Sequence, residues 1–329
     1  MTVAIAAFNA AAFLEASVQS ALAQKGVIVE VVVVDDCSSD GTIQVLERLA
    51  RDEPRIRIER LRENQGPAAA RNRAFSVARG EWIAVLDSDD LFASDRLSAL
   101  IEKAELRGTD IIADNPILFD EAEPSRARRL LGFAEPGWIP LESYLAETRL
   151  FARGRDYGYL KPVFRTAALH RDGLAYDERL RIAEDDDLIV RALLTGLRYW
   201  FESTPGYGYR RHDGSTSHRL SLANASSMAT VGAELADRFS EHPSATALKR
   251  RAAAFGRAQS FVRLIDALKR RDAGQVLEIA MRSPQMLPLL RMPFQAALKR
   301  AIPAFRHASS PPDDMAICAL EKMIGARHT

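Results

Sequence analysis

The fold class of this chain is decided by residues 29–42, which read Val29-Glu30-Val31-Val32-Val33-Val34-Asp35-Asp36-Cys37-Ser38-Ser39-Asp40-Gly41-Thr42. The β-branched run shows no clear alternation of polar and apolar residues, so it predicts a strand that is buried on both faces, as in a parallel sheet. The acidic pair ends this strand, and the Ser-Ser-Asp-Gly that follows has the chemistry of a turn and a helix cap. The stretch therefore predicts a central parallel strand that leads into a helix.

The same alternation of strand and helix extends to both sides of this stretch. We expect strands at residues 3–7, 56–58, 82–86 and 110–113, and helices at residues 11–24, 42–51, 67–79 and 96–107. Pro67 supports the third of these helices, because its fixed φ suits the first helical position. This order predicts an α/β fold with a doubly wound, mostly parallel sheet flanked by helices.

The character of the sequence changes after about residue 115, where Pro, Gly and charged residues become frequent up to about residue 160. A helix is expected at 184–195, and short strands at 198–202 and 207–211. From about residue 220 onward the pattern is helical. We therefore expect a catalytic domain at residues 1–217 and a C-terminal helical region at residues 218–329.

The composition is that of a globular protein, with 329 residues, 47% hydrophobic and 27% charged. The 45 basic and 44 acidic residues nearly cancel, so no nucleic-acid partner is expected. Two cysteines cannot build a disulfide framework or a multi-cysteine zinc site. The longest apolar stretch, residues 27–34, is far shorter than the roughly 20 residues of a membrane span. We expect a cytoplasmic protein without a targeting segment.

Acidic clusters follow two of the predicted strands: Asp35-Asp36, and Asp87-Ser88-Asp89-Asp90. Ligands of open parallel sheets bind at the carboxyl ends of the strands. Carboxylates gathered there would repel one another, and hard oxygen ligands suit Mg²⁺ or Mn²⁺. The alternative is that these aspartates only cap the helices that follow.

Three further features each have a functional and a structural interpretation. Arg71 lies in the first turns of a helix, where it either attracts an anion or is solvated. The acidic run from Glu184 to Asp187 contains a candidate general base or suits the positive end of a helix. His212 is a metal ligand or a structural histidine.

Together these pieces form one ordered pattern that strongly resembles the family 2 glycosyltransferases of the GT-A fold. The resemblance covers about residues 1–217. Its motifs are Ala6-Ala7-Phe8-Asn9, Val33 to Thr42, Asn64-Gln65-Gly66-Pro67-Ala68-Ala69-Ala70-Arg71-Asn72, Leu86-Asp87-Ser88-Asp89-Asp90 and Glu184-Asp185. Departures from the family pattern are Ala7 and Ser94 in place of Pro and Cys37 in place of Gly, which concern loop shape and capping.

The resemblance implies a role for each matched residue. Nucleotide contacts fall on Ala7, Phe8, Asn9, Asp36, Arg71, Asp87, Ser88 and Asp89, with Asp36 accepting from the uracil imide. A Mg²⁺ or Mn²⁺ ion on the diphosphate would be held by Asp89 or Asp90, between which the sequence does not choose, and by His212. The catalytic base falls on Asp185, and the reaction would invert the anomeric configuration.

The resemblance also implies substrates. The donor would be a UDP-sugar, and the acceptor a glycan or a polyprenyl-linked saccharide. Residues 159–165 look like those of bacterial exopolysaccharide enzymes, including the succinoglycan type, which indicates glucose from UDP-glucose. The absence of spans distinguishes the chain from processive polysaccharide synthases.

Two alternative functions fit the sequence less well. A receiver-type signalling module would need an Asp after the third strand and a Lys after the fifth, where this chain has Arg60 and Asp114. A catalytically inactive sugar-binding relative is disfavoured by the intact Asp89, Asp90 and Asp185.

The C-terminal region carries a strong positive charge. Residues 245–307 contain 13 Lys or Arg and three acids, a net charge of +10, interleaved with apolar residues. Basic amphipathic helices bind anionic membrane surfaces. We expect peripheral contact with the cytoplasmic face of the inner membrane; the alternative is a helical cap with a solvated basic face.

Overall fold

The fold is taken from a computed structural model and is described for residues 1–132, 134–148, 156–212, 220–284 and 313–325. The described residues form two compact units. Residues 220–284 make up unit two, and all other described residues belong to unit one.

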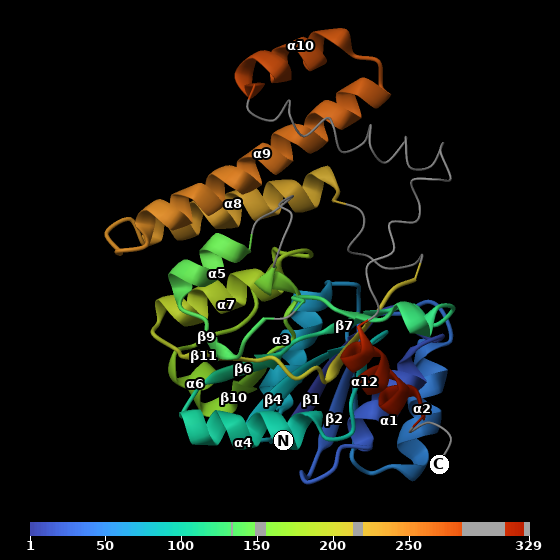
Figure 1. The fold of residues 1–329 in the computed structure, drawn as a ribbon. Helices are drawn as coiled ribbons and strands as arrows, with labels where there is room; N and C mark the ends of the chain where they lie inside the picture. The colour runs from blue at the N-terminus through green and yellow to red at the C-terminus, as the bar shows by residue number, and fades with distance from the viewer. Residues whose placement is uncertain (133, 149–155, 213–219, 285–312, 326–329) are drawn as a thin grey trace. The chain divides into compact units, whose positions relative to one another are not determined.

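Unit one is built on an eight-stranded sheet (Figure 1). In spatial order its strands are β3 (Ile56–Arg60), β2 (Glu30–Asp35), β1 (Thr2–Ala7), β4 (Trp82–Asp87), β10 (Val163–Arg165), β6 (Ile111–Asp114), β11 (Tyr199–Glu202) and β9 (Gly137–Trp138). The first four strands are parallel, as is the pair β6 and β11, whereas β10 runs antiparallel to both of its neighbours. Ala7 pairs with Asp35, and Ala6 pairs with Asp87. The ends of β1, β2 and β4 therefore form one edge, here called the carboxyl edge.

Helices bury this sheet because its central strands are apolar on both faces. Alternate residues such as Ile5, Val33 and Leu86 share one core with α1 (Leu14–Leu22), α2 (Thr42–Asp52) and α4 (Arg96–Arg107). The intervening residues, such as Ala4 and Val32, are also fully buried. Helix α3 (Pro67–Val77) contacts β1 and β2. The unit also contains α5 (Leu141–Glu147), α6 (Thr166–Arg171) and α7 (Glu184–Leu194).

A second, four-stranded sheet has the order β5 (Leu91–Phe92), β12 (Tyr207–Arg210), β7 (Ile117–Phe119) and β8 (Arg128–Arg129). The last helix, α12 (Asp314–Gly325), contacts β7 and β8. Its Ala316, Leu320 and Met323 share an apolar core with residues of β5 and β7. An ion pair of 3.0 Å between Arg129 Nε and Asp313 Oδ2 fixes the start of this helix.

Unit two consists of α8 (Leu222–Arg238), α9 (Ala245–Lys269) and α10 (Ala273–Arg282). Helices α8 and α9 pack along each other, and α10 packs on α9. Gly232 permits a close approach, since a Cβ atom there would lie 2.8 Å from Cδ2 of Phe255. None of the helices in the described part of the chain combines the length and the apolar character that a membrane span requires.

The structure confirms the predicted fold class: a doubly wound, mostly parallel sheet flanked by helices, with helices toward the C-terminus. Several short elements were not expected from the sequence, namely the strands β5, β7, β8, β9 and β10 and the helices α5 and α6. The three-residue strand β10 enters the sheet between β4 and β6, and so short a strand leaves little periodic signal. The described part of residues 218–329 is helical, and its last helix, α12, belongs to unit one and buries its apolar face there. Residues 285–312 of that region lie outside the described residues.

Candidate active site

The loops after β1 and β2 form one end of the carboxyl edge. Asn9 Oδ1 accepts from the backbone N–H of Ser39 at 2.9 Å, and Asn9 N–H donates to Ser38 Oγ at 2.9 Å. Both Asn9 and Cys37 have left-handed backbone conformations, with φ of 51° and 60°. These bonds leave the Phe8 ring 48% exposed at the rim, an unusual exposure for a large apolar side chain. Exposed aromatic rings offer a surface on which a nucleobase can stack.

Asp36 lies beneath this rim and is almost fully buried. Its Oδ1 accepts from the N–H of Gln65 at 2.7 Å, and its Oδ2 accepts from Gly66 N–H at 2.8 Å and Asn64 Nδ2 at 2.9 Å. Burial raises the pKa of Asp36, and these N–H donors counteract the rise. The carboxylate therefore holds the loop that leads into α3. It does not cap α2, the helix that follows it; Asp40 bonds there to Thr42 N–H.

Gly66 is required at this junction for its backbone conformation. Its φ of 94° lies in the region that favours glycine, and its N–H is the one bound by Asp36. Pro67 follows at the first position of α3. The loop thereby sets the start of the helix that carries Arg71.

In the second acidic cluster, Asp90 is buried and its neighbour Asp89 is accessible. Asp90 is 2% exposed, and it accepts from Tyr207 Oη at 2.6 Å and from the N–H of Arg210 at 2.8 Å. Burial raises the pKa of Asp90 well above its ordinary value, and the charges of Asp89 and Asp87 add to the rise. Asp90 therefore ties the loop after β4 to β12. Ser17 of α1 fixes the same loop by donating to the carbonyl oxygens of Ser88 and Asp90.

Asp89 points the other way and meets His212. The Asp89 side chain is 31% exposed, and its Oδ2 lies 2.9 Å from His212 Nε2. The histidine ring also packs against the ring of Phe13 in a tilted arrangement, with ring centroids 4.4 Å apart. The carboxylate oxygens of Asp89 are ligands of the kind that Mn²⁺ or Mg²⁺ prefers, and the imidazole nitrogen of His212 lies beside them. No cluster of three or more such ligands occurs within the described ranges.

Four charged side chains form a closed ring next to this loop. Arg71 contacts Asp87 Oδ1 at 2.7 Å and Asp185 Oδ1 at 3.2 Å. Lys161 Nζ contacts Asp87 Oδ2 at 2.7 Å and Asp185 Oδ2 at 2.9 Å. Positive and negative groups thus alternate around the ring Arg71–Asp87–Lys161–Asp185, here called the charge ring. Glu184 adds a third carboxylate, at 2.6 Å from Arg71 Nη1.

The charge ring keeps its buried carboxylates ionised. Burial alone would raise the pKa of Asp185, but Arg71 and Lys161 hold it below the ordinary value. The same two cations lower the pKa of Asp87 against the effect of burial. Glu184 differs: burial raises its pKa, although Arg71 partly offsets this rise. Of this pair, Asp185 is therefore the carboxylate whose ionised form is favoured.

The first-turn acids of α7 thus divide into two groups. Glu184 and Asp185 face the charge ring, whereas Asp187 pairs with Arg191 on its own helix at 2.8 Å. The interpretation as a simple helix-start cluster applies to Asp187. It does not describe the two residues on which the family motif falls.

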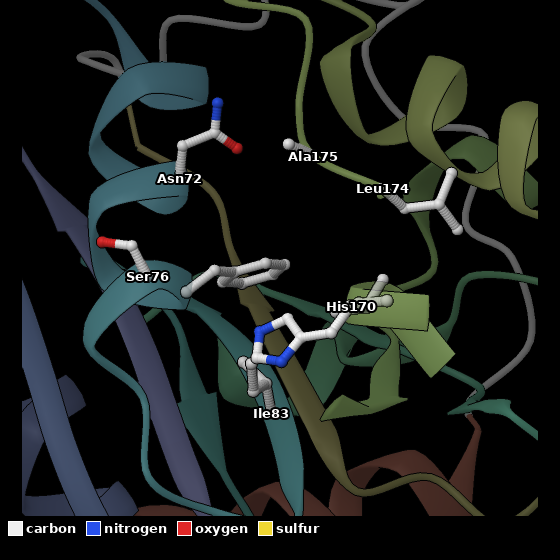
Figure 2. Close-up of a pocket in the computed structure, with 8 residues that line it drawn as sticks. Asn72, Ser76, Ile83, His170, Leu174 and Ala175 are labelled. Atoms are coloured by element: carbon white, nitrogen blue, oxygen red, sulfur yellow. The ribbon is translucent and has the colours of Figure 1, made fainter. Parts of the chain in front are cut away.

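A separate cavity of about 270 Å³ lies beside α3 and α6 (Figure 2). Its wall includes Asn72 and Ser76 of α3, Ile83 of β4 and His170 of α6. Among the described residues that line it, none is Asp, Glu, Lys or Arg. The cavity therefore offers no carboxylate, ammonium or guanidinium group from the lining residues that the structure describes.

Several residues of this site were not singled out from the sequence, namely Ser17, Lys161, Tyr207 and Arg210. Lys161 does leave a signal: it is a cation within an otherwise apolar run, Leu160 to Phe164, next to a buried strand. A buried lysine requires carboxylate partners, so this pattern points to an ion pair without naming the partner.

Comparison with known proteins accounts for this arrangement. The sequence profile of the family described as Glycosyl transferase family 2 matches residues 2–172. The chain belongs to glycosyl transferase family 2. This family 2 glycosyltransferase is 38% identical over 314 residues to the succinoglycan biosynthesis protein ExoO of Rhizobium meliloti, which covers 94% of this chain and 89% of the relative. It is 40% identical over 221 residues to ExoU of the same organism, covering 65% and 64% of the two chains.

Solved structures support the GT-A-like fold of this family 2 glycosyltransferase. S. aureus TarS 1–349 in complex with UDP-GlcNAc matches with a TM-score of 0.60 and 21% identity, over 86% of this chain and 91% of TarS. The complex of the same protein with UDP matches with a TM-score of 0.58. At 21% identity this likeness concerns the fold alone.

Proposed function

We propose that this family 2 glycosyltransferase transfers a sugar from a UDP-sugar donor to an acceptor hydroxyl with inversion of configuration. The observation that carries the proposal is the charge ring at the carboxyl edge, which joins Asp185 to Asp87, two residues before the accessible Asp89. A candidate base and a candidate diphosphate site thus lie side by side.

The nucleotide end of the donor would bind along the loops after β1 and β2. Phe8 offers its exposed ring, and Ala7 and Asn9 supply the loop backbone around it. The carboxylate of Asp36 accepts three hydrogen bonds and can accept one more, because an ionised carboxylate has about four lone-pair sites. A uracil imide N–H can therefore be added without breaking the bonds that hold residues 64–66.

The diphosphate would lie near Asp87, Ser88 and Asp89, with Arg71 nearby. Asp89 and His212 would hold a Mg²⁺ or Mn²⁺ ion, whose charge screens the diphosphate as it leaves. Asp90 is assigned the structural role that its burial and its bonds to β12 support. Asp185 takes the proton of the acceptor hydroxyl as that oxygen forms a bond to the anomeric carbon. The bond from that carbon to the diphosphate breaks on the opposite side, and UDP leaves.

The relatives guide the choice of substrates. ExoO and ExoU are named for succinoglycan biosynthesis, so we assign this chain to exopolysaccharide or surface polysaccharide assembly. UDP-glucose is the proposed donor, and a glycan or polyprenyl-linked saccharide is the proposed acceptor. An acceptor of the second kind would place the enzyme at the cytoplasmic face of the inner membrane.

The test is a panel of nucleotide sugars, including UDP-glucose and UDP-GlcNAc, with Mg²⁺, Mn²⁺ or chelator. We expect thermal stabilisation by UDP-sugars that requires the cation, and slow hydrolysis of the preferred donor. Equal UDP affinity with and without chelator would contradict the metal assignment. Binding of a donor that is never hydrolysed or transferred would identify an inactive relative.

A further inference from the structure

Lys161 lies within residues 159–165, a stretch that resembles exopolysaccharide enzymes but to whose lysine the resemblance gives no role. It lies directly before Pro162 and the antiparallel strand β10, which the sheet inserts beside β4. Its backbone carbonyl accepts from Arg96 Nη2 at 2.8 Å, and Arg96 is itself paired with Asp114 in the core. The main chain at Lys161 is therefore fixed, and its ammonium group reaches the charge ring while the residue stays 6% exposed.

The two cations of the ring do not hold Asp185 equally. Arg71 Nη1 is shared between Glu184 at 2.6 Å and Asp185 at 3.2 Å. Lys161 gives Asp185 the shorter contact, 2.9 Å, and gives Asp87 one of 2.7 Å. Without Lys161, three carboxylates would depend on the single guanidinium of Arg71.

We propose that Lys161 is a positioning residue for sugar transfer, which holds the carboxylate of Asp185 ionised and fixed in orientation beside Asp87. This inference rests on the proposed role of Asp185 as the base. Lys161 acts through Asp185 and Asp87, and it has no proton-transfer step of its own.

The electrostatics around Asp185 agree with this role. Several charged and titratable groups face Asp185. They are Arg71 of α3, Asp87 of β4, Lys161 before β10, Tyr176 before α7, Tyr199 of β11 and Glu184 of its own helix. Burial works against the ammonium form of Lys161, but Asp185 and Asp87 raise the pKa of Lys161 well above its ordinary value. Lys161 therefore stays charged throughout the working pH range. An opposite charge at this distance typically lowers a carboxyl pKa by about 1 to 3 units.

The test compares Lys161→Met, which keeps the length of the side chain without its charge, with Lys161→Arg, which keeps the charge. Lys103→Met is the matched control, since Lys103 is exposed on α4. The measurement is the pH profile of kcat/KM for transfer, because this profile reports the pKa of the base in the free enzyme. A base must be ionised to act, so activity falls as the pH drops through its pKa.

In the pH profile of kcat/KM, we expect the fall in activity at acidic pH to occur about 1 to 3 pH units higher for Lys161→Met than for the wild type. This fall should stay at the same low pH in Lys103→Met and Lys161→Arg as in the wild type, even if Lys161→Arg is slower overall. A purely structural role predicts a different result: Lys161→Met would lose activity by the same factor at every pH. That result, or a fall that also moves to higher pH in Lys161→Arg, would overturn the inference.

The outcome is separable from the proposed function. If the wild type transfers no sugar from any UDP-sugar, the proposed function fails. If the wild type transfers sugar and the profile of Lys161→Met has an unchanged shape, only the assignment of Lys161 fails. Thermal unfolding of each variant identifies a loss of activity that comes from unfolding.

Discussion

Replacing Asp89 or Asp90 by alanine should affect two different properties, the cation dependence of UDP binding and the stability of the fold. Asp90→Ala should destabilise the fold, whereas Asp89→Ala should leave stability nearly unchanged and abolish the cation dependence of UDP binding. The reason is that Asp90 accepts from Tyr207 Oη and Arg210 N–H in the interior, while the side chain of Asp89 is 31% exposed beside His212.

The size of the Asp90 effect follows from these bonds. Alanine leaves two buried donors without an acceptor, at about 1–3 kcal/mol each. The raised pKa of Asp90 means that its ionised form is itself disfavoured by burial, so removing it recovers part of this cost. A net loss of about 2–4 kcal/mol is expected, which corresponds to a decrease in Tm of roughly 4–16 °C. Asp89→Ala should change stability by about 0.5 kcal/mol or less.

The assay combines thermal unfolding without ligand and calorimetric titration with UDP, in Mn²⁺ and in chelator. Asp89→Ala should bind UDP with the same weak affinity in both conditions. Asp90→Ala should unfold at a lower temperature but, below that temperature, still bind UDP more tightly with Mn²⁺. If Asp90→Ala keeps the wild-type Tm and loses the Mn²⁺ effect, the assignment of the two residues is reversed and the reasoning from burial is wrong.

Three further predictions concern other parts of the chain. Asp185→Asn should lower the transfer rate by about 10²–10⁴ and leave UDP affinity within a factor of a few; transfer at the wild-type rate would move the base to another residue. Cys37→Gly should raise stability by about 1 kcal/mol, because Cys37 has a φ of 60°, whereas Cys37→Ala should give no gain in the same unfolding experiment. The full-length protein should co-sediment with anionic liposomes at low salt, since residues 245–284 alone carry nine Lys or Arg against three acids; binding that ignores lipid charge would leave the basic helices as a solvated cap.

The sequence by itself determined the architecture around the carboxyl edge. A strand buried on both faces must be apolar throughout, so the run from Val29 to Val34 identified a central parallel strand. Alternating helices then placed the ends of β1, β2 and β4 at one edge. The acidic residues after these strands were expected to meet there, because chain direction in a parallel sheet fixes which ends lie together.

Only the tertiary structure decided which of these carboxylates are accessible and what each one contacts. Asp89 and Asp90 are neighbours with the same side chain, yet β12 buries Asp90 under Tyr207 and leaves Asp89 beside His212. The contact of Lys161 with Asp87 and Asp185 depends on β10, an antiparallel strand of three residues. Helix α12 likewise packs on the four-stranded sheet, although about 100 residues separate it from β12, the last strand of that sheet in the sequence. The periodicity of apolar residues indicates only the local environment of each residue. An ion pair or an apolar contact requires two segments that are distant in the sequence to lie within a few ångströms of each other. Only tertiary packing sets those positions.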